Sequence, residues 1–157
     1  MRRWSFNLQI YFLAHRFRSQ KLISDSGLPS IQDRTIYEDV EIFARSLYEQ
    51  GYMSERDHQT YRDLFNDMVF FLPKPDLIIY LKASIKTLVA RIKSRGRDFE
   101  RTISPDYLEY LNLAYERWIR EAQEKFTILI VNADEVDFIK ENDKFEELVK
   151  KIREYCP

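Results

Sequence analysis

Glycine is scarce in this sequence, which has only Gly27, Gly51 and Gly96 among its 157 residues. A phosphate-binding loop of the form G-x-x-x-x-G-K-[ST] holds nucleotide phosphates with the backbone amides of a glycine-rich turn and with a lysine. Three isolated glycines cannot form that loop, and the pattern does not occur in the sequence. The 157 residues therefore contain no such phosphate loop.

Cysteine and long apolar runs are also lacking. Cys156 is the single cysteine, which excludes an internal disulfide and favours a reducing compartment. No apolar run approaches the roughly 18 residues of a membrane-spanning helix. Gln9, His15 and Arg16 interrupt the start of the chain, which does not read as a signal peptide. We expect a cytoplasmic protein.

Neither sign of charge is in excess, since 25 Lys and Arg face 26 Asp and Glu, for a net charge of −1. The overall field therefore attracts neither nucleic acid nor an anionic membrane, and we expect neither as a partner. Hydrophobic residues form 45% of the chain and aromatic residues 15%, which indicates a globular core. The length predicts one domain over residues 1–157.

Helical and strand patterns alternate along the chain. Phe6, Ile10, Leu13 and Phe17 recur at helical spacing, and cap signals mark the starts of further helices. We predict helices at about 4–22, 36–49, 54–71, 84–95, 104–122 and 138–155. The strands are predicted at 30–33, 76–81 and 126–132, the last two as apolar runs covered on both faces. The alternation predicts an α/β fold with a parallel sheet.

Gln9, Phe12 and Arg16 form a stripe beside the apolar face of the first helix. An amide, an aromatic ring and a guanidinium in a row suit recognition of a nucleobase, by hydrogen bonds and by stacking. The alternative is a polar surface pair next to one more core phenylalanine. The stripe by itself leaves both interpretations open.

Asp33 and Arg34 follow the first predicted strand, and Asp39 and Phe43 lie one turn apart on the helix after it. In open parallel sheets ligands bind beyond the carboxyl ends of the strands. An acid there can hold Mg²⁺, and an adjacent arginine can bind a phosphate. The alternative is an ion pair at the strand end, with Asp39 stabilised by a helix dipole.

Four arginines gather within eleven residues around Gly96: Arg91, Arg95, Arg97 and Arg101, with Glu100 among them. Guanidinium groups on a glycine-hinged loop suit the charge that develops during phosphoryl transfer. Cations near the C-terminal end of a helix also interact favourably with the helix dipole. Capping alone does not require so many arginines, so we favour a functional role.

Three segments in register resemble the deoxyribonucleoside kinase family, which includes bacterial deoxyadenosine and deoxyguanosine kinases. They begin at Arg3-Trp-Ser-Phe, Asp33-Arg-Thr and Arg95-Gly-Arg97. The resemblance, which runs to about Phe145, implies a three-layer P-loop kinase-like α/β fold with a parallel sheet. It also implies transfer of the ATP γ-phosphate to the 5′-hydroxyl of a deoxynucleoside, in a homodimer with ATP and Mg²⁺.

The same resemblance assigns a role to each candidate residue. The base would contact Gln9, Phe12, Phe43 and the pair Arg16 and Asp39. Asp33 would lie near Mg²⁺, Arg34 at the phosphate and 5′-oxygen, and Glu100 at the sugar 3′-hydroxyl. Arg95 and Arg97 would cover the phosphates. Arg91 would pack on the adenine of ATP, with Asp137 and Phe138 on its other side.

The sequence departs from that family at its start. The family opens with a strand and the phosphate loop, followed by a strand with the glutamate that acts as general base, and none of these occurs here. We therefore expect a kinase domain without its first strand or strands and phosphate loop, inactive by itself. A shortened chain or a start codon assigned too far downstream would explain this.

Two other interpretations remain open. One is a non-catalytic remnant that serves binding or oligomerisation, and the other is a nucleotide kinase of the thymidylate kinase type. Glutamine can bond adenine, guanine or cytosine by rotating its amide, so Gln9 does not fix the base. The surroundings of Phe12 and Asp39 resemble those of the bacterial members of the family, and this resemblance implies a purine.

Overall fold

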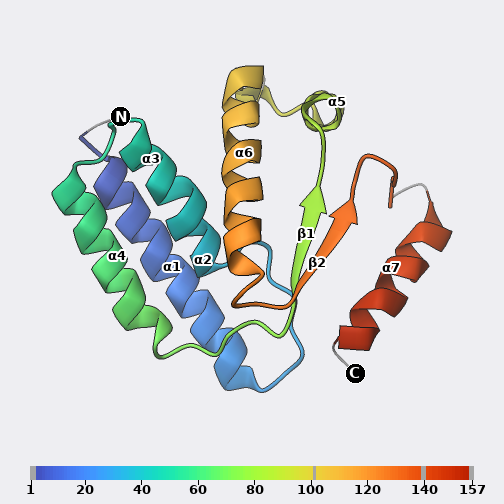
Figure 1. The fold of residues 1–157 in the computed structure, drawn as a ribbon, viewed down its shortest axis with the longest axis horizontal. Coiled ribbons are helices and arrows are strands. Elements are labelled where there is room, and N and C mark those ends of the chain that lie inside the picture. Colours follow the sequence, from blue (N-terminus) through green and yellow to red (C-terminus); the bar gives the residue numbers. More distant parts are fainter. Residues whose placement is uncertain (1–2, 101, 139–140, 156–157) are drawn as a thin grey trace. The chain divides into compact units, whose positions relative to one another are not determined.

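The computed structural model describes residues 3–100, 102–138 and 141–155. They form two compact units, Met1–Lys74 and Pro75–Pro157, which are described separately (Figure 1). The single domain predicted over residues 1–157 stays a prediction. Among the described residues, no helix combines the length and apolar character needed to cross a membrane.

The first unit is helical. Its helices are α1 (Ser5–Ser26), α2 (Ile36–Glu38), the π-helix η1 (Asp39–Ala44), α3 (Arg45–Glu49) and α4 (Glu55–Val69). Helices α1 and α4 pack together, and α1 also packs on η1. The buried apolar side chains meet in one cluster, whose members are Leu13, Ile36, Val40, Ala44, Tyr61, Phe65 and Leu72. The predicted helical stripe of Phe6, Ile10, Leu13 and Phe17 is confirmed as the side of α1 that joins this core.

The helix ends follow local signals in the sequence. α1 continues past the predicted end to Ser26, and Gly27 closes it with a φ of 63°, a conformation that glycine adopts without strain. The Thr35 amide donates to Glu38 Oε2 at 2.6 Å, as the predicted capping box requires. Ser54 Oγ accepts from the Asp57 amide at 3.1 Å and starts α4.

The prediction of a strand at residues 30–33 is wrong, because that segment has no strand structure. Ile31 is 92% exposed, and no strand among the described residues pairs with the segment. An extended segment becomes a strand only when a neighbouring strand accepts and donates its backbone hydrogen bonds. Asp33 and Arg34 therefore lie in a loop that leads into α2, and not at a strand end.

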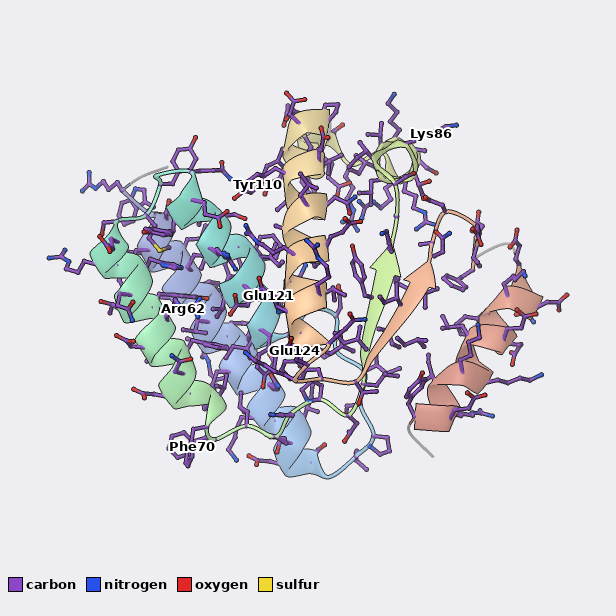
Figure 2. The ribbon with its side chains drawn as sticks, in the orientation of Figure 1. Arg62, Phe70, Lys86, Tyr110, Glu121 and Glu124 are labelled. Carbon is purple, nitrogen blue, oxygen red and sulfur yellow. The ribbon has the colours of Figure 1, made fainter. Side chains whose placement is uncertain are left out.

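His58 of α4 stacks on Tyr48 of α3, with ring centroids 4.3 Å apart and planes 1° apart. Burial, then the nearby cations Arg62 and Arg45, lower the pKa of His58, and Glu49 opposes them. Arg62 projects from the same helix (Figure 2). The folded chain thus favours the neutral imidazole.

This stacking predicts how stability changes with pH. A histidine whose pKa is lower in the folded chain stabilises it above the unfolded pKa of about 6.5, and that contribution is lost as the pH falls. We expect the free energy of unfolding, measured in urea, to fall between about pH 7.5 and pH 5. His58→Gln should reduce this slope. His15→Gln is the matched control, and equal slopes in both variants would contradict the prediction.

The second unit contains the sheet. Strands β1 (Ile78–Lys82) and β2 (Ile128–Asn132) are parallel, with Ile78 opposite Ile128 and Lys82 opposite Asn132. Between them lie α5 (Ile85–Arg95), the 3₁₀ turn η2 (Asp98–Glu100) and α6 (Pro105–Ala122), followed after β2 by α7 (Asn142–Tyr155). The predicted parallel α/β arrangement is confirmed.

Helix α6 lies against the face of the sheet that carries Tyr80 and Lys82. The rings of Tyr80 and Tyr115 stack with centroids 6.1 Å apart, and Lys82 Nζ lies 2.8 Å from Glu116 Oε1. The caps predicted at Ser84 and Ser104 are confirmed. Each hydroxyl accepts a hydrogen bond from a backbone amide in the first turn of the helix that follows it. Gly96, with a φ of 65°, ends α5 as predicted.

Two predictions for this unit are wrong. No residue of β1 or β2 is fully buried, and Leu81 is 51% and Ile130 46% exposed. Both strands are edge strands among the described residues, so their side chains lack a neighbour on one side. The last helix was predicted from Phe138 but begins at Asn142, and Phe138 lies in a turn. Residues 139 and 140 lie outside the described residues.

Candidate functional site

Three predicted base-contacting residues lie on α1. Gln9 is 5% exposed, and its Oε1 is a buried acceptor without a hydrogen-bond partner among the described residues. Phe12, one turn further on, is 40% exposed. Arg16 lies two turns, or about 10 Å, from Gln9 along the helix axis. A buried amide oxygen without a donor is costly, by about 1–3 kcal/mol, so this position suits a ligand that supplies one.

Arg16 connects α1 to the two segments that follow it. Its Nε lies 3.3 Å from Asp39 Oδ2, and its Nη1 donates to the Asp33 carbonyl at 3.1 Å. Asp39 is 5% exposed. Burial raises the pKa of Asp39 above its usual range, while Arg16 and, less strongly, Arg34 act to lower it. The structure thus brings together Arg16 and Asp39, as predicted for the base-reading pair.

Arg34 and Phe43 form a second contact beside this pair. The guanidinium carbon of Arg34 lies 4.7 Å from the centroid of the Phe43 ring, within the range of a cation–π interaction. Arg34 has a φ of 61°, a left-handed conformation that is uncommon for a residue with a side chain. Asp39 and Phe43 belong to the π-helix η1. Strained backbone and π-helical turns both occur often at functional sites.

Asp33 is the residue predicted to lie near Mg²⁺. Its side chain is exposed, and its backbone carbonyl accepts from Arg16. No group of three or more His, Cys, Asp or Glu side chains in the described parts of the chain is arranged to hold a metal. Mg²⁺ is usually bound through one or two carboxylates plus waters and substrate phosphates. Asp33 fits a metal held in that way, and does not fit a site built from protein ligands alone.

The second unit brings together Arg95, Arg97 and Glu100. Glu100 is 8% exposed; its Oε2 lies 3.3 Å from Arg95 Nη2 and its Oε1 3.4 Å from Arg97 Nη1. The guanidinium groups are about half exposed, with 52% of the Arg95 side chain and 56% of the Arg97 side chain accessible. They can therefore reach an anion while Glu100 holds them in place. Arg101 lies outside the described residues.

Arg91 lies on α5 and binds the loop after β2. Its Nη2 donates to the carbonyl of Ala133 at 2.7 Å and to that of Val136 at 3.1 Å. This loop continues into Asp137 and Phe138, which the resemblance assigns to the same adenine site as Arg91. Arg91 is thus placed beside the loop that carries them.

In this region the sequence interpretation missed Asp134 and gave Ser84 only as a helix cap. Ser84 follows β1 and Asp134 follows β2, and the Ser84 amide donates to Asp134 Oδ1 at 2.9 Å. Polar residues directly after parallel strands meet at one edge of the sheet, so their positions were available as a signal. Tyr61 was also missed. Its buried hydroxyl has no hydrogen-bond partner among the described residues, and burial, then Asp39, raise its pKa.

The candidate residues thus form two groups, one in each unit. The first holds Gln9, Phe12, Arg16, Asp33, Arg34, Asp39 and Phe43, and the second holds Arg91, Arg95, Arg97, Glu100, Asp137 and Phe138. The convergence of both groups on one pocket stays a prediction.

Comparisons with known proteins show the family to which the chain belongs. The sequence model of the family described as deoxynucleoside kinase matches residues 1–157. The deoxyadenosine/deoxycytidine kinase of Bacillus subtilis (strain 168) is 40% identical over 152 residues, covering 96% of this chain and 70% of that protein. The deoxyguanosine kinase of the same organism is 37% identical over 161 residues, covering 98% of this chain and 75% of that protein.

A solved structure shows the same fold. Deoxyadenosine kinase from M. mycoides, with the products dCMP and dCDP bound, superposes with a TM-score of 0.80 at 34% identity, covering 98% of this chain and 76% of that one. The chain belongs to the deoxynucleoside kinase family. The P-loop kinase-like fold expected from the resemblance is confirmed.

Proposed function

We propose that this chain belongs to an ATP-dependent deoxynucleoside kinase. Its first unit binds the deoxynucleoside. The buried Gln9 Oε1, without a hydrogen-bond partner among the described residues, carries this proposal. Arg16 lies on the same helix and pairs with Asp39 of η1. The amide oxygen accepts from an exocyclic amino group of the base and the amide nitrogen donates to a ring nitrogen. Phe12 and Phe43 flank the base, and the Arg16 and Asp39 pair completes its recognition.

The remaining candidates act on the sugar and the phosphates. Arg34 binds the transferred phosphate and the 5′-oxygen, and Glu100 accepts from the sugar 3′-hydroxyl. Arg95 and Arg97 stabilise negative charge on the equatorial oxygens during transfer. Mg²⁺ bound with ATP would neutralise part of the charge on the phosphates. Asp33 is its protein ligand in this proposal. A homodimer in the cytoplasm, without a nucleic-acid partner, belongs to the same proposal.

The base in this proposal is a purine. An amide oxygen free to accept suits the exocyclic amino group of adenine, and two deoxyadenosine kinases are among the similar proteins. Cytosine also carries an exocyclic amino group, and the B. subtilis relative is described as a deoxyadenosine/deoxycytidine kinase. Deoxycytidine is therefore the second candidate substrate.

Gln9→Ala tests the proposal through ligand binding. Loss of both amide hydrogen bonds should weaken deoxyadenosine binding about ten- to a hundred-fold, measured by isothermal titration calorimetry. Gln20→Ala is the matched control, because Gln20 lies on the same helix, is 8% exposed and also has a buried Oε1 without a partner among the described residues. It lies about 16 Å further along the axis and should leave binding unchanged.

Three outcomes would contradict the proposal: a wild-type chain that binds none of the four deoxynucleosides, Gln9→Ala binding as wild type, or equal losses in both variants. That these 157 residues transfer no phosphate by themselves stays a prediction. A coupled assay for ADP release with each deoxynucleoside checks it.

A further inference from the structure

The loop that follows β2 is fastened to α5 at two points. At the start of the helix, the backbone amide of Ser84 donates to Asp134 Oδ1 at 2.9 Å, and the Ser84 hydroxyl donates to the same oxygen at 3.1 Å. Further along the helix, Arg91 donates to the carbonyls of Ala133 and Val136. Lys86, labelled in Figure 2, lies in the first turn of α5, close in the sequence to Ser84.

The two attachment points restrict how α5 can move. Ser84 and Arg91 are seven residues apart, which corresponds to about 10 Å along a helix. A single contact would leave the loop free to pivot on the helix, whereas two contacts at this separation prevent it. The Ala133 amide also donates to the Lys82 carbonyl at 2.7 Å, which ties the same loop to β1. Helix and loop therefore form one rigid piece.

This piece carries predicted site residues at both of its ends. α5 ends in Arg95 and leads to Arg97, while the loop leads to Asp137 and Phe138. We propose that Asp134 is a positioning residue for the half of the site that binds the phosphate donor: its carboxylate fixes α5, and with it the arginines at its end, relative to loop 133–138. This inference rests on the proposed kinase function, which assigns those residues to ATP.

Asp134 is not needed to start the helix. Ser84 Oγ accepts from the Thr87 amide at 3.3 Å, so α5 has a cap of its own. Hydrogen bonds from the Thr87 side chain and the Ser84 backbone lower the pKa of Asp134, so the ionised carboxylate is the bound form. Removing this side chain should leave α5 folded but detached from the loop at one point.

Hydrogen exchange on the full 157-residue chain tests the attachment. In Asp134→Ala, amides in residues 84–88, 95–100 and 133–138 should all exchange faster, by up to roughly ten-fold. Asp134→Asn retains an acceptor oxygen and should restore most of the protection. Glu135→Gln is the matched control, because Glu135 accepts from Asn132 at the end of β2 and makes no described contact with α5.

Ligand binding separates positioning from a general loss of structure. Asp134→Ala should weaken binding of a fluorescent ATP analogue about ten-fold, in line with the exchange effect, and leave deoxyadenosine binding unchanged. A variant that is merely less folded would lose affinity for both ligands. Asp134→Asn should recover ATP binding, and Glu135→Gln should bind both ligands as the wild type does.

Each result decides one question. Faster exchange confined to residues 133–135, or equal behaviour of Asp134→Ala and Glu135→Gln, would overturn the role of Asp134. The same holds if the alanine variant binds the ATP analogue as tightly as wild type. If the wild-type chain binds neither nucleoside nor nucleotide, the proposed function fails, and the exchange pattern still shows whether Asp134 fixes α5.

Discussion

Arg16→Met is expected to lower the free energy of unfolding by about 3 kcal/mol at neutral pH. The substitution leaves Asp39 buried, 5% exposed and without the guanidinium that lies 3.3 Å away in the native chain. It also removes the hydrogen bond to the Asp33 carbonyl, which ties the loop before α2 to α1. Urea unfolding followed by far-ultraviolet circular dichroism measures the loss.

The loss in free energy of unfolding caused by Arg16→Met should depend on pH in a definite direction. Burial already raises the pKa of Asp39, so its stabilising contribution is present at low pH and is lost as the pH rises through the folded pKa. Arg16 opposes that shift, and removing it raises the pKa of Asp39 further. The difference between variant and wild type should therefore be smaller in acid and grow towards neutral pH.

Two further variants make this prediction specific. Arg18→Met places the same change at an exposed position of α1, where Arg18 donates to the Ala14 carbonyl, and should cost less than about 0.5 kcal/mol. Arg16→Met combined with Asp39→Leu removes both charges and should recover most of the lost stability. A double variant as unstable as Arg16→Met alone would show that the unpaired Asp39 carboxylate is not the cause.

Leu13→Ala is expected to have an effect of similar size, about 3 kcal/mol, through a cavity in the core. Leu13 is fully buried, at 0% exposure, and lies on α1 between Gln9 and Arg16. Its neighbours in the core include Val40, directly after Asp39 in the π-helix. The cavity should therefore also loosen the base-reading residues and weaken deoxyadenosine binding, measured by calorimetry beside the urea midpoint.

Leu22→Ala is the matched control for this change. Leu22 lies on the same helix but is 71% exposed, so its truncation should change stability by less than about 0.5 kcal/mol. Similar losses at both positions would contradict the assignment of Leu13 to the core of the first unit. A large loss at Leu13 with unchanged nucleoside binding would separate the core from the proposed site.

The helices could be predicted because their signals are local. Spacing of apolar residues located α1, hydroxyl caps at Ser54, Ser84 and Ser104 located three further helix starts, and Gly27 and Gly96 end helices by their left-handed conformation. The prediction of a strand at residues 30–33 was wrong, because strand pairing depends on another segment and not on the four residues concerned. The π-helix over Asp39–Ala44 had no signal in the spacing.

Apart from the Arg16 and Asp39 pair, which the resemblance implied, the candidate site was predicted as sets of residues and not as contacts. The sequence placed Gln9 and Arg16 on one face of α1 and grouped Arg95, Arg97 and Glu100. It did not show that Glu100 pairs with both arginines, nor that Arg91 binds the carbonyls of Ala133 and Val136. Asp134 and Tyr61 stood out only once burial and hydrogen bonding were known.

The sequence by itself determined the helices, their caps, the two parallel strands and the family to which the chain belongs, because each rests on neighbours in the chain or on motifs in register. The tertiary structure decided which charges pair, which amide is buried without a partner and which loop is fixed to which helix. Several of those outcomes depend on residues far apart in the sequence, such as Arg16 with Asp39 or Ser84 with Asp134. Their energies come from burial and geometry that appear only when the chain has folded.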